Sequence, residues 1–307
     1  MSAEIIDGNK IAETMMQALT SDFRAYQDKA GKEANLLILR IGNDEGARIY
    51  SEAKVKRAKK LGVRSNVIEI PSATRDEVLE KIQAFSADPN VTGIMIENPV
   101  PPPLDFSDLV DHIPFYKDVD GTSSTNQGRI VNRKEFLTPA TPSAVVEIMS
   151  RYSELKTGIV TIINRSPVVG RPLSQMLLNR DYTISVCHSK TPDIVQYTRR
   201  SDAVIAAIGK ANFFTDEFLN PDCTFIDVGI NYVNGKVVGD GDFARLSKWI
   251  KRITPVPGGV GPITATMIFS NHFSIDIIYA DVYECAVRIQ EFIREEVCLT
   301  DRGYHRI

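Results

Sequence analysis

Cysteine is scarce in this sequence, and its positions exclude two common uses of the residue. The 307 residues include four cysteines: Cys187, Cys223, Cys285 and Cys298. No two of them form a C-x-x-C pair, and four are too few for a disulfide framework in a chain of this length. The four histidines also lack metal-ligand spacing to each other or to a cysteine. We therefore expect reduced thiols and no metal site.

Long apolar runs and an excess of charge are also missing. No apolar run approaches the roughly 18–20 residues that a membrane-spanning helix needs. The first residues, MSAEIIDGNKIAETMMQ, lack the basic and apolar regions of a secretory signal. Lys plus Arg (36) nearly balance Asp plus Glu (39), so no overall charge attracts nucleic acid or an anionic membrane. We expect a cytoplasmic protein with neither as a partner.

What is present is an alternation of short apolar runs with helical patterns. Strands are predicted at Leu36–Ile41, Asn66–Ile70, Val91–Ile96, Gly158–Ile163, Tyr182–Val186, Ala203–Ala207, Thr224–Val228 and Trp249–Thr254. Helices are predicted at Ile11–Tyr26, Gly46–Leu61, Arg75–Phe85, from near Ser143, and from Pro262 to about Val297 with a break near Asn271–Ser274. Alternating strands and helices predict an α/β fold with parallel sheets. At roughly 150 residues per domain, the length suggests two domains. We place them at residues 1–142 and 143–273, with a final helix, 274–300, returning to the first.

A phosphate-binding loop is predicted after the strand that ends at Ile163. The segment NRSPVVGRP, with Asn164, Arg165, Ser166 and Gly170, lies between that strand and a helical pattern. Strand, loop and helix N-terminus are the parts that hold a pyrophosphate. The regular G-x-G-x-x-G is absent, so a plain strand-to-helix turn remains the alternative.

The segment after the next strand bears on the choice of cofactor. There His188, Ser189, Lys190 and Thr191 stand where an NAD site usually has a carboxylate for the ribose hydroxyl. Hydroxyl and cationic groups, with Arg165 from the preceding loop, suit a 2′-phosphate and thus favour NADP. A solvated turn is the alternative.

Three further features carry candidate chemistry. Tyr50 and Lys54 are four residues apart in a helical pattern and share one face, where a lysine can act as a base. Glu97 ends an apolar strand, and Asp120 lies in the loop segment KDVDG. The segment PVPGGVGPIT, at 255–264, has three glycines and three prolines in eight residues, directly before a helix. Taken singly, solvated-helix and turn roles remain open for these residues.

Together and in this order, these motifs make the sequence resemble the methylenetetrahydrofolate dehydrogenase/methenyltetrahydrofolate cyclohydrolase family over nearly its whole length. The matching segments are IIDGNKIA, Tyr50-x-x-x-Lys54, GIMIENPVP, KDVDG, TPATP, NRSPVVGRP, CHSKT, IDVGIN and PVPGGVGPIT. The resemblance implies an N-terminal α/β domain that binds folate, a Rossmann-type domain that binds NADP, and an active site between them. It also implies a homodimer formed through the nucleotide domain.

The resemblance also implies residue roles. Lys54 would be the main catalytic residue, assisted by Tyr50, Glu97 and Asp120. Tyr50 would orient the folate, and Asp120 would bind the amino-pyrimidine edge of its pterin. The folate side of the cleft would include Gly261, Pro262 and Thr264, and the cofactor site Asn164, Arg165, Ser166, Gly170, His188, Ser189 and Ile230.

The implied reactions are NADP-dependent oxidation of 5,10-methylenetetrahydrofolate to the methenyl form and its hydrolysis to 10-formyltetrahydrofolate. At position 97 the family usually has Gln, whereas this chain has Glu. A carboxylate beside Lys54 favours the ammonium form, which is a poorer base. We therefore expect retained oxidation, with hydrolysis that is weak or displaced to higher pH. A dehydrogenase-only member and a non-enzymatic nucleotide-binding homologue are the alternatives.

Overall fold

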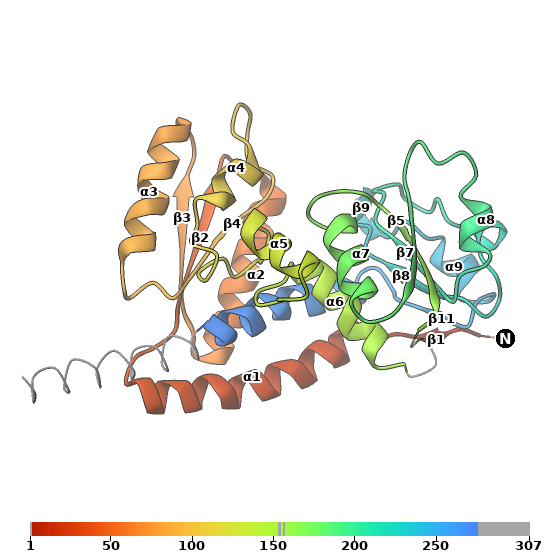
Figure 1. The fold of residues 1–307 in the computed structure, drawn as a ribbon, viewed down its shortest axis with the longest axis horizontal. Helices are drawn as coiled ribbons and strands as arrows, with labels where there is room; N and C mark the ends of the chain where they lie inside the picture. The colour runs from red at the N-terminus through yellow and green to blue at the C-terminus, as the bar shows by residue number, and fades with distance from the viewer. Residues whose placement is uncertain (1, 153–154, 156, 276–307) are drawn as a thin grey trace, which may run out of the picture.

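Two parallel sheets lie at opposite ends of the molecule in the computed structural model (Figure 1). The structure describes residues 2–152, 155 and 157–275. This arrangement confirms the predicted α/β class. None of the helices in the described part of the chain combines the length and apolarity that a membrane span requires.

The first sheet has three strands, with β2 in the centre and buried along its whole length. The strands are β2 (Asn35–Ile41), β3 (Arg64–Ile70) and β4 (Gly93–Ile96), in the order β3-β2-β4. One face packs against α3 (Arg75–Ala87) and α4 (Phe106–Asp111), and the other against α2 (Glu45–Leu61). Asp44 caps the start of α2, and Gly62, in the left-handed region, ends it.

The second sheet has six parallel strands in the order β1-β11-β8-β7-β5-β6. They are β1 (Glu4–Ile5), β5 (Ile159–Ile163), β6 (Thr183–Cys187), β7 (Ala203–Ala206), β8 (Thr224–Asp227) and β11 (Arg252–Ile253). One face is covered by α6 (Ala140–Ser150) and α7 (Gly170–Leu178), and the other by α8 (Val195–Thr198), η2 (Asp216–Phe218) and α9 (Phe243–Leu246). β6 is added on one side of β5 and β7 on the other, so the order in which strands are added reverses between β5 and β7. In open α/β sheets this switch point is where ligands bind.

Two helices join the cores of the two sheets. α1 (Gly8–Ala30) is about 35 Å long at 1.5 Å per residue. Its first turns pack in the second core through Ile11, and its later turns pack in the first through Phe23. Residues 260–275 form a helix that does the same, through Ile263 and Phe269. The two sheets are therefore held in one relative orientation.

All eight predicted strands are present, although Trp249–Thr254 contributes only β11. β1 was not predicted, because two residues carry no periodicity. α6 begins at Ala140, earlier than the expected Ser143, because Pro142 is tolerated in a first helical turn. The predicted break near Asn271–Ser274 is wrong: 260–275 is continuously helical, and Asn271 donates to two backbone carbonyls outside the helix, those of Val119 and Thr138. The division at residues 142 and 143 stays a prediction, and most of the expected returning helix, 276–300, lies outside the described residues.

The chain between β4 and α6 contains two short helices. These are α4 and α5 (Ser124–Val131). Asn234 and Gly235 form a tight turn in which both residues have positive φ, 50° and 73°. It joins β9 (Asn231–Val233) to β10 (Lys236–Val238) in a hairpin that follows β8.

Candidate active site

A buried ion pair joins α2 to the end of β4. The Lys54 Nζ atom lies 2.7 Å from Oε1 and 2.8 Å from Oε2 of Glu97. Lys54 is only 9% exposed and Glu97 4%. The Glu97 amide donates to the Leu39 carbonyl, which fixes the residue at the carboxyl end of the sheet. Two residues predicted separately from a helix face and a strand end thus form one unit.

The KDVDG loop divides its charged residues between structure and site. Lys117 Nζ donates to the carbonyls of Ser86 and Asp88. The buried Asp118 carboxylate accepts from the amides of Gly121 and Ser123 and from the Asn126 side chain. These contacts shape the loop, so the turn role left open in the sequence applies to Asp118.

Asp120, in contrast, is close enough to the Lys54–Glu97 pair for both charges to act on its carboxyl group. Burial raises its pKa to about 7, with further raising by the carboxylates of Asp118 and Glu97 and an opposing effect from Lys54. A group that responds to both members of the pair lies in the same electrostatic environment. Near neutral pH Asp120 is therefore divided between an acceptor-only carboxylate and a neutral acid that can donate one hydrogen bond.

Tyr50 links this cluster to the β9–β10 hairpin. It lies one turn before Lys54 on α2 and is 43% exposed. Burial and, after it, the neighbouring Tyr232 raise the pKa of the Tyr50 hydroxyl. Tyr232 is in β9, two residues after the exposed Ile230 that follows β8. No sequence pattern indicated Tyr232, because its place depends on how the two sheets pack.

The predicted nucleotide loop follows β5 at the switch point, and Asn164 shapes it. Its Oδ1 accepts from the amides of Ser166 (2.7 Å) and Gly170 (3.0 Å), and its Nδ2 donates to the Ala207 carbonyl (2.5 Å). A Cβ atom at Gly170 would lie 2.1 Å from the Asn164 carbonyl oxygen, so only glycine allows α7 to start here. Arg165, between them, is exposed.

The loop after β6 lies beside the loop after β5, because these strands are neighbours. His188 Nδ1 accepts from the Lys190 amide, and the His188 amide donates to Thr191 Oγ1. Ser189 is exposed at the tip of this turn. The loop is therefore held by its own hydrogen bonds while Ser189 stays exposed. Its role in binding a 2′-phosphate stays a prediction.

The Gly/Pro-rich segment is held against the start of α1. Asp7 caps this helix, and the Gly8 amide donates to the Gly258 carbonyl. A Cβ at Gly8 would lie 1.7 Å from the Gly259 carbonyl oxygen, so the motif IIDGNKIA requires its glycine for this contact. Gly261 is exposed with open space around it, and Pro262 and Thr264 are half-buried. The substrate role of these three stays a prediction.

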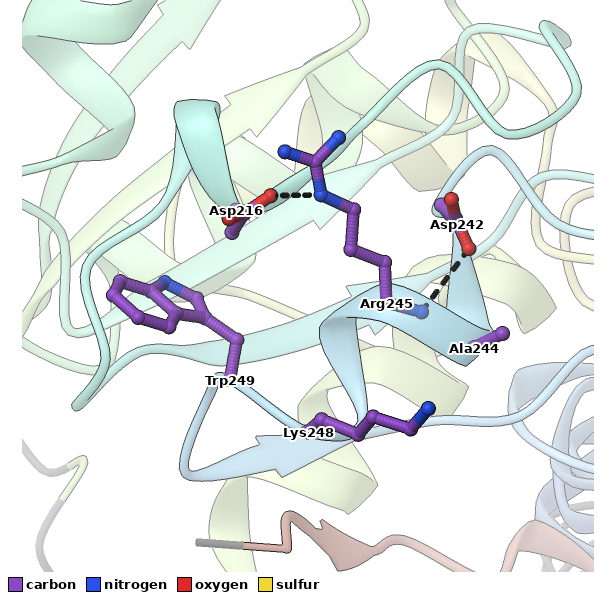
Figure 2. Close-up of a pocket in the computed structure, with 6 residues that line it drawn as sticks. All are labelled: Asp216, Asp242, Ala244, Arg245, Lys248 and Trp249. Atoms are coloured by element: carbon purple, nitrogen blue, oxygen red, sulfur yellow. Dashed lines mark hydrogen bonds and ion pairs between the residues drawn. The ribbon is translucent and has the colours of Figure 1, made fainter.

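A hollow beside α9, in the part of the chain that contains the second sheet, includes none of the predicted residues (Figure 2). It is lined by Asp216, Asp242, Ala244, Arg245, Lys248 and Trp249. Arg245 is paired with Asp216, and Asp242 caps α9. Arg245, Asp216 and Asp242 thus have structural roles, and the candidate site remains the cluster around Lys54.

Comparisons with known proteins agree in both halves of the chain. The family model for the tetrahydrofolate dehydrogenase/cyclohydrolase catalytic domain matches residues 6–120, and that for its NAD(P)-binding domain matches residues 139–280. The bifunctional protein FolD of Thermoplasma acidophilum is 49% identical over 268 residues, 87% of this chain and 95% of the relative.

Solved structures show the same similarity. The bifunctional 5,10-methylenetetrahydrofolate dehydrogenase/cyclohydrolase from Thermoplasma acidophilum has a TM-score of 0.85 at 47% identity, covering 91% of this chain and 100% of the other. The methylenetetrahydrofolate dehydrogenase-cyclohydrolase from Trypanosoma brucei, complexed with NADP and an inhibitor, has a TM-score of 0.85 at 29% identity, covering 90% and 98%.

Proposed function

This chain belongs to the tetrahydrofolate dehydrogenase/cyclohydrolase family, and we propose that it oxidises 5,10-methylenetetrahydrofolate with NADP and hydrolyses the methenyl product to 10-formyltetrahydrofolate. The observation that carries the proposal is the cluster of Lys54, Glu97 and Asp120 at the carboxyl end of the first sheet, with Tyr50 beside Tyr232 of the β9–β10 hairpin. These are the positions to which the resemblance assigns the folate.

The folate side is suited to a pterin. The Asp120 carboxylate can accept two hydrogen bonds from the N–H groups of an amino-pyrimidine. The half-exposed ring of Tyr50 offers a flat apolar surface next to Lys54. In the oxidation these residues position the one-carbon bridge, and the Glu97 carboxylate stabilises the positive charge that develops on the methenyl product.

The second sheet fits a dinucleotide at its switch point. The tight Asn164–Gly170 turn places the start of α7 directly after β5 at the switch point, and the exposed Arg165 and Ser189 lie on the adjoining loops for a 2′-phosphate. When bound, NADP supplies the hydride acceptor. Ile230 lies two residues from the Tyr232 that contacts Tyr50, which connects the cofactor side to the folate side.

In the hydrolysis, water adds to the methenyl carbon and the ring opens. Lys54 assists the proton transfers, and its contact with Glu97 sets how readily it can accept a proton. This is the step that the exchange of the usual Gln for Glu97 should affect most.

A homodimer and a cytoplasmic location stay predictions from the resemblance and the sequence. β6 forms one end of the second sheet, and Val186 on it is 41% exposed. Such an edge offers main-chain groups to a second copy. Sedimentation equilibrium of the full chain tests the dimer.

The test of the function is a spectrophotometric assay. Purified protein with methylenetetrahydrofolate and NADP+ should produce the absorbance of methenyltetrahydrofolate, with much weaker activity on NAD+. Arg165→Ala should raise the KM for NADP+, because it removes a charge-assisted contact that is typically worth about 1.5–3 kcal/mol. The kinetics with NAD+ should stay unchanged. Absence of methenyl formation with either cofactor would reject the enzyme, and equal use of both would reject the NADP assignment.

A further inference from the structure

A row of alternating charges crosses the first sheet on the face that α2 covers. Arg40 of β2 pairs in register with Glu69 of β3. On the other side Leu39 pairs with Ile96, and the Glu97 amide donates to the Leu39 carbonyl, so Glu97 is the neighbour of Arg40. Paired residues of parallel strands point to the same face. The row therefore reads Glu69, Arg40, Glu97.

Arg40 belongs to none of the motifs, yet it is as buried as Lys54, at 9% exposure. Its Nη2 atom lies 2.6 Å from Glu69 Oε1, and its Nη1 donates at 3.0 Å to Ser51 Oγ. Ser51 is fully buried on α2, one turn before Lys54. A single guanidinium thus connects the sheet to the turn of α2 that precedes the catalytic lysine.

We propose that Arg40 is a positioning residue for the Lys54–Glu97 pair, placing a second buried positive charge beside the Glu97 carboxylate. The proposal rests on the proposed function for its kinetic consequences. Glu69, the direct partner of Arg40, has a side chain that is 65% exposed, so water screens that ion pair. Arg40 also acts on Glu45 of α2, which is likewise exposed to water. Of the carboxylates near Arg40, the buried Glu97 is therefore the one whose interaction water screens least.

The consequence concerns the proton on Lys54. A carboxylate whose only buried cation is Lys54 favours the ammonium form of that lysine strongly. A second cation beside the carboxylate repels the ammonium group and so reduces this preference for the ammonium form. The charged groups on the elements packed here are Arg40 and Glu69 from the sheet, Asp120 from the KDVDG loop, and Glu45 and Arg57 from α2. Glu97 makes Lys54 a poorer base by stabilising its ammonium form, and Arg40 therefore partly counteracts this effect.

The experiment is a double-mutant cycle of Arg40→Gln and Glu97→Gln in the full-length protein. Arg40→Gln should lower kcat for hydrolysis about tenfold at neutral pH, with the KM for NADP+ unchanged, and move the rate–pH curve to higher pH. In the Glu97→Gln background the same change should alter kcat less than about twofold. Equal effects of Arg40→Gln in both backgrounds would overturn the proposal.

Two further variants separate charge from packing. Arg40→Lys keeps the charge, so it should restore most of the wild-type pH profile. Glu69→Gln removes the exposed partner and should leave the profile in place. If Arg40→Lys matched Arg40→Gln, the role would be packing alone and the proposal would fail.

A thermal-unfolding cycle on the same four proteins requires no activity. Arg40→Gln should lower the Tm more when Glu97 is present than when Gln replaces it. An inactive wild type would reject the proposed function. The thermal cycle would still test whether Arg40 and Glu97 interact, because it needs no activity. If the Tm changes of the two single variants simply added in the double variant, the proposed interaction would be rejected.

Discussion

Both carboxylate oxygens of Glu97 accept from the Lys54 ammonium group, at 2.7 and 2.8 Å, in a place almost closed to water. Buried pairs of this kind are not automatically stabilising, because each charge loses its hydration. Removing one charge alone leaves the other unpaired, at a typical cost of about 3–5 kcal/mol. A loss of activity in Lys54→Ala could therefore reflect lost stability as well as a lost catalytic group. Substitutions of Glu97 are more informative.

Glu97→Gln should increase the hydrolysis of methenyltetrahydrofolate at neutral pH, on the order of tenfold. The amide can still accept from Lys54, but it no longer stabilises the ammonium form, so more of the lysine is available as a base. Oxidation should be retained or modestly reduced, because a charge that stabilises the cationic product is lost. Both rates are measured on the same preparation. A wild type that hydrolyses briskly, with no gain in the variant, would show that the carboxylate does not restrain Lys54.

The sequence predicted the members of this site better than their arrangement. Each member was marked by a local feature: Tyr50 and Lys54 by a helix spacing, Glu97 by a strand end, and Asp120 by the loop segment KDVDG. Arg40 and Tyr232 were not, because their importance arises from register between strands and from packing between sheets. β1 was missed for the same reason: Glu4 and Ile5 pair with residues that lie some 250 positions later in the chain. Local patterns identify elements, whereas long-range pairing must be read from the structure.

Asp120→Asn should raise the KM for folate while leaving the KM for NADP+ within about twofold. The amide oxygen can accept, but its NH2 group faces the pterin N–H donors and repels one of them. The raised pKa of about 7 adds a pH dependence in the wild type. As pH falls below 7 the carboxyl becomes protonated and loses acceptor capacity, so the folate KM should rise towards acid. In Asp120→Asn that rise should disappear; if it persisted, another group would be responsible.

Two glycines provide a matched pair for the two sides of the cleft. Gly170→Ala places a Cβ 2.1 Å from the Asn164 carbonyl oxygen, so the loop must move and NADP+ binding should weaken at least about tenfold. Gly261→Ala meets nothing within 4 Å, so its Tm should stay close to that of the wild type. If Gly261 lines the folate site, its added methyl group should raise the folate KM alone. Unchanged folate kinetics would remove Gly261 from the site.

His272 links the helix of residues 260–275 to the first sheet. Its Nε2 lies 2.6 Å from Thr92 Oγ1, and its ring packs edge-on against Phe23. A Cβ at Gly93 would lie 3.0 Å from the ring, so the strand is shaped to admit it. Complete burial lowers the pKa of this histidine to about 3, and the ring is neutral throughout the physiological range.

Because this pKa is lowered on folding, the unfolded chain binds more protons than the folded one below pH 6.5. The stability held at neutral pH should therefore decline as pH falls from about 6.5 towards 3. At pH 5 the loss from this group should be about 2 kcal/mol, at 1.36 kcal/mol per pH unit. His272→Gln should lower the Tm at pH 7, since the Thr92 contact is disturbed, yet show a smaller further drop between pH 7 and pH 5. Thermal unfolding at both pH values measures this, and His112→Gln, which removes an exposed histidine, is the control. If His272→Gln lost as much stability between the two pH values as the wild type, acid sensitivity would arise elsewhere in the protein.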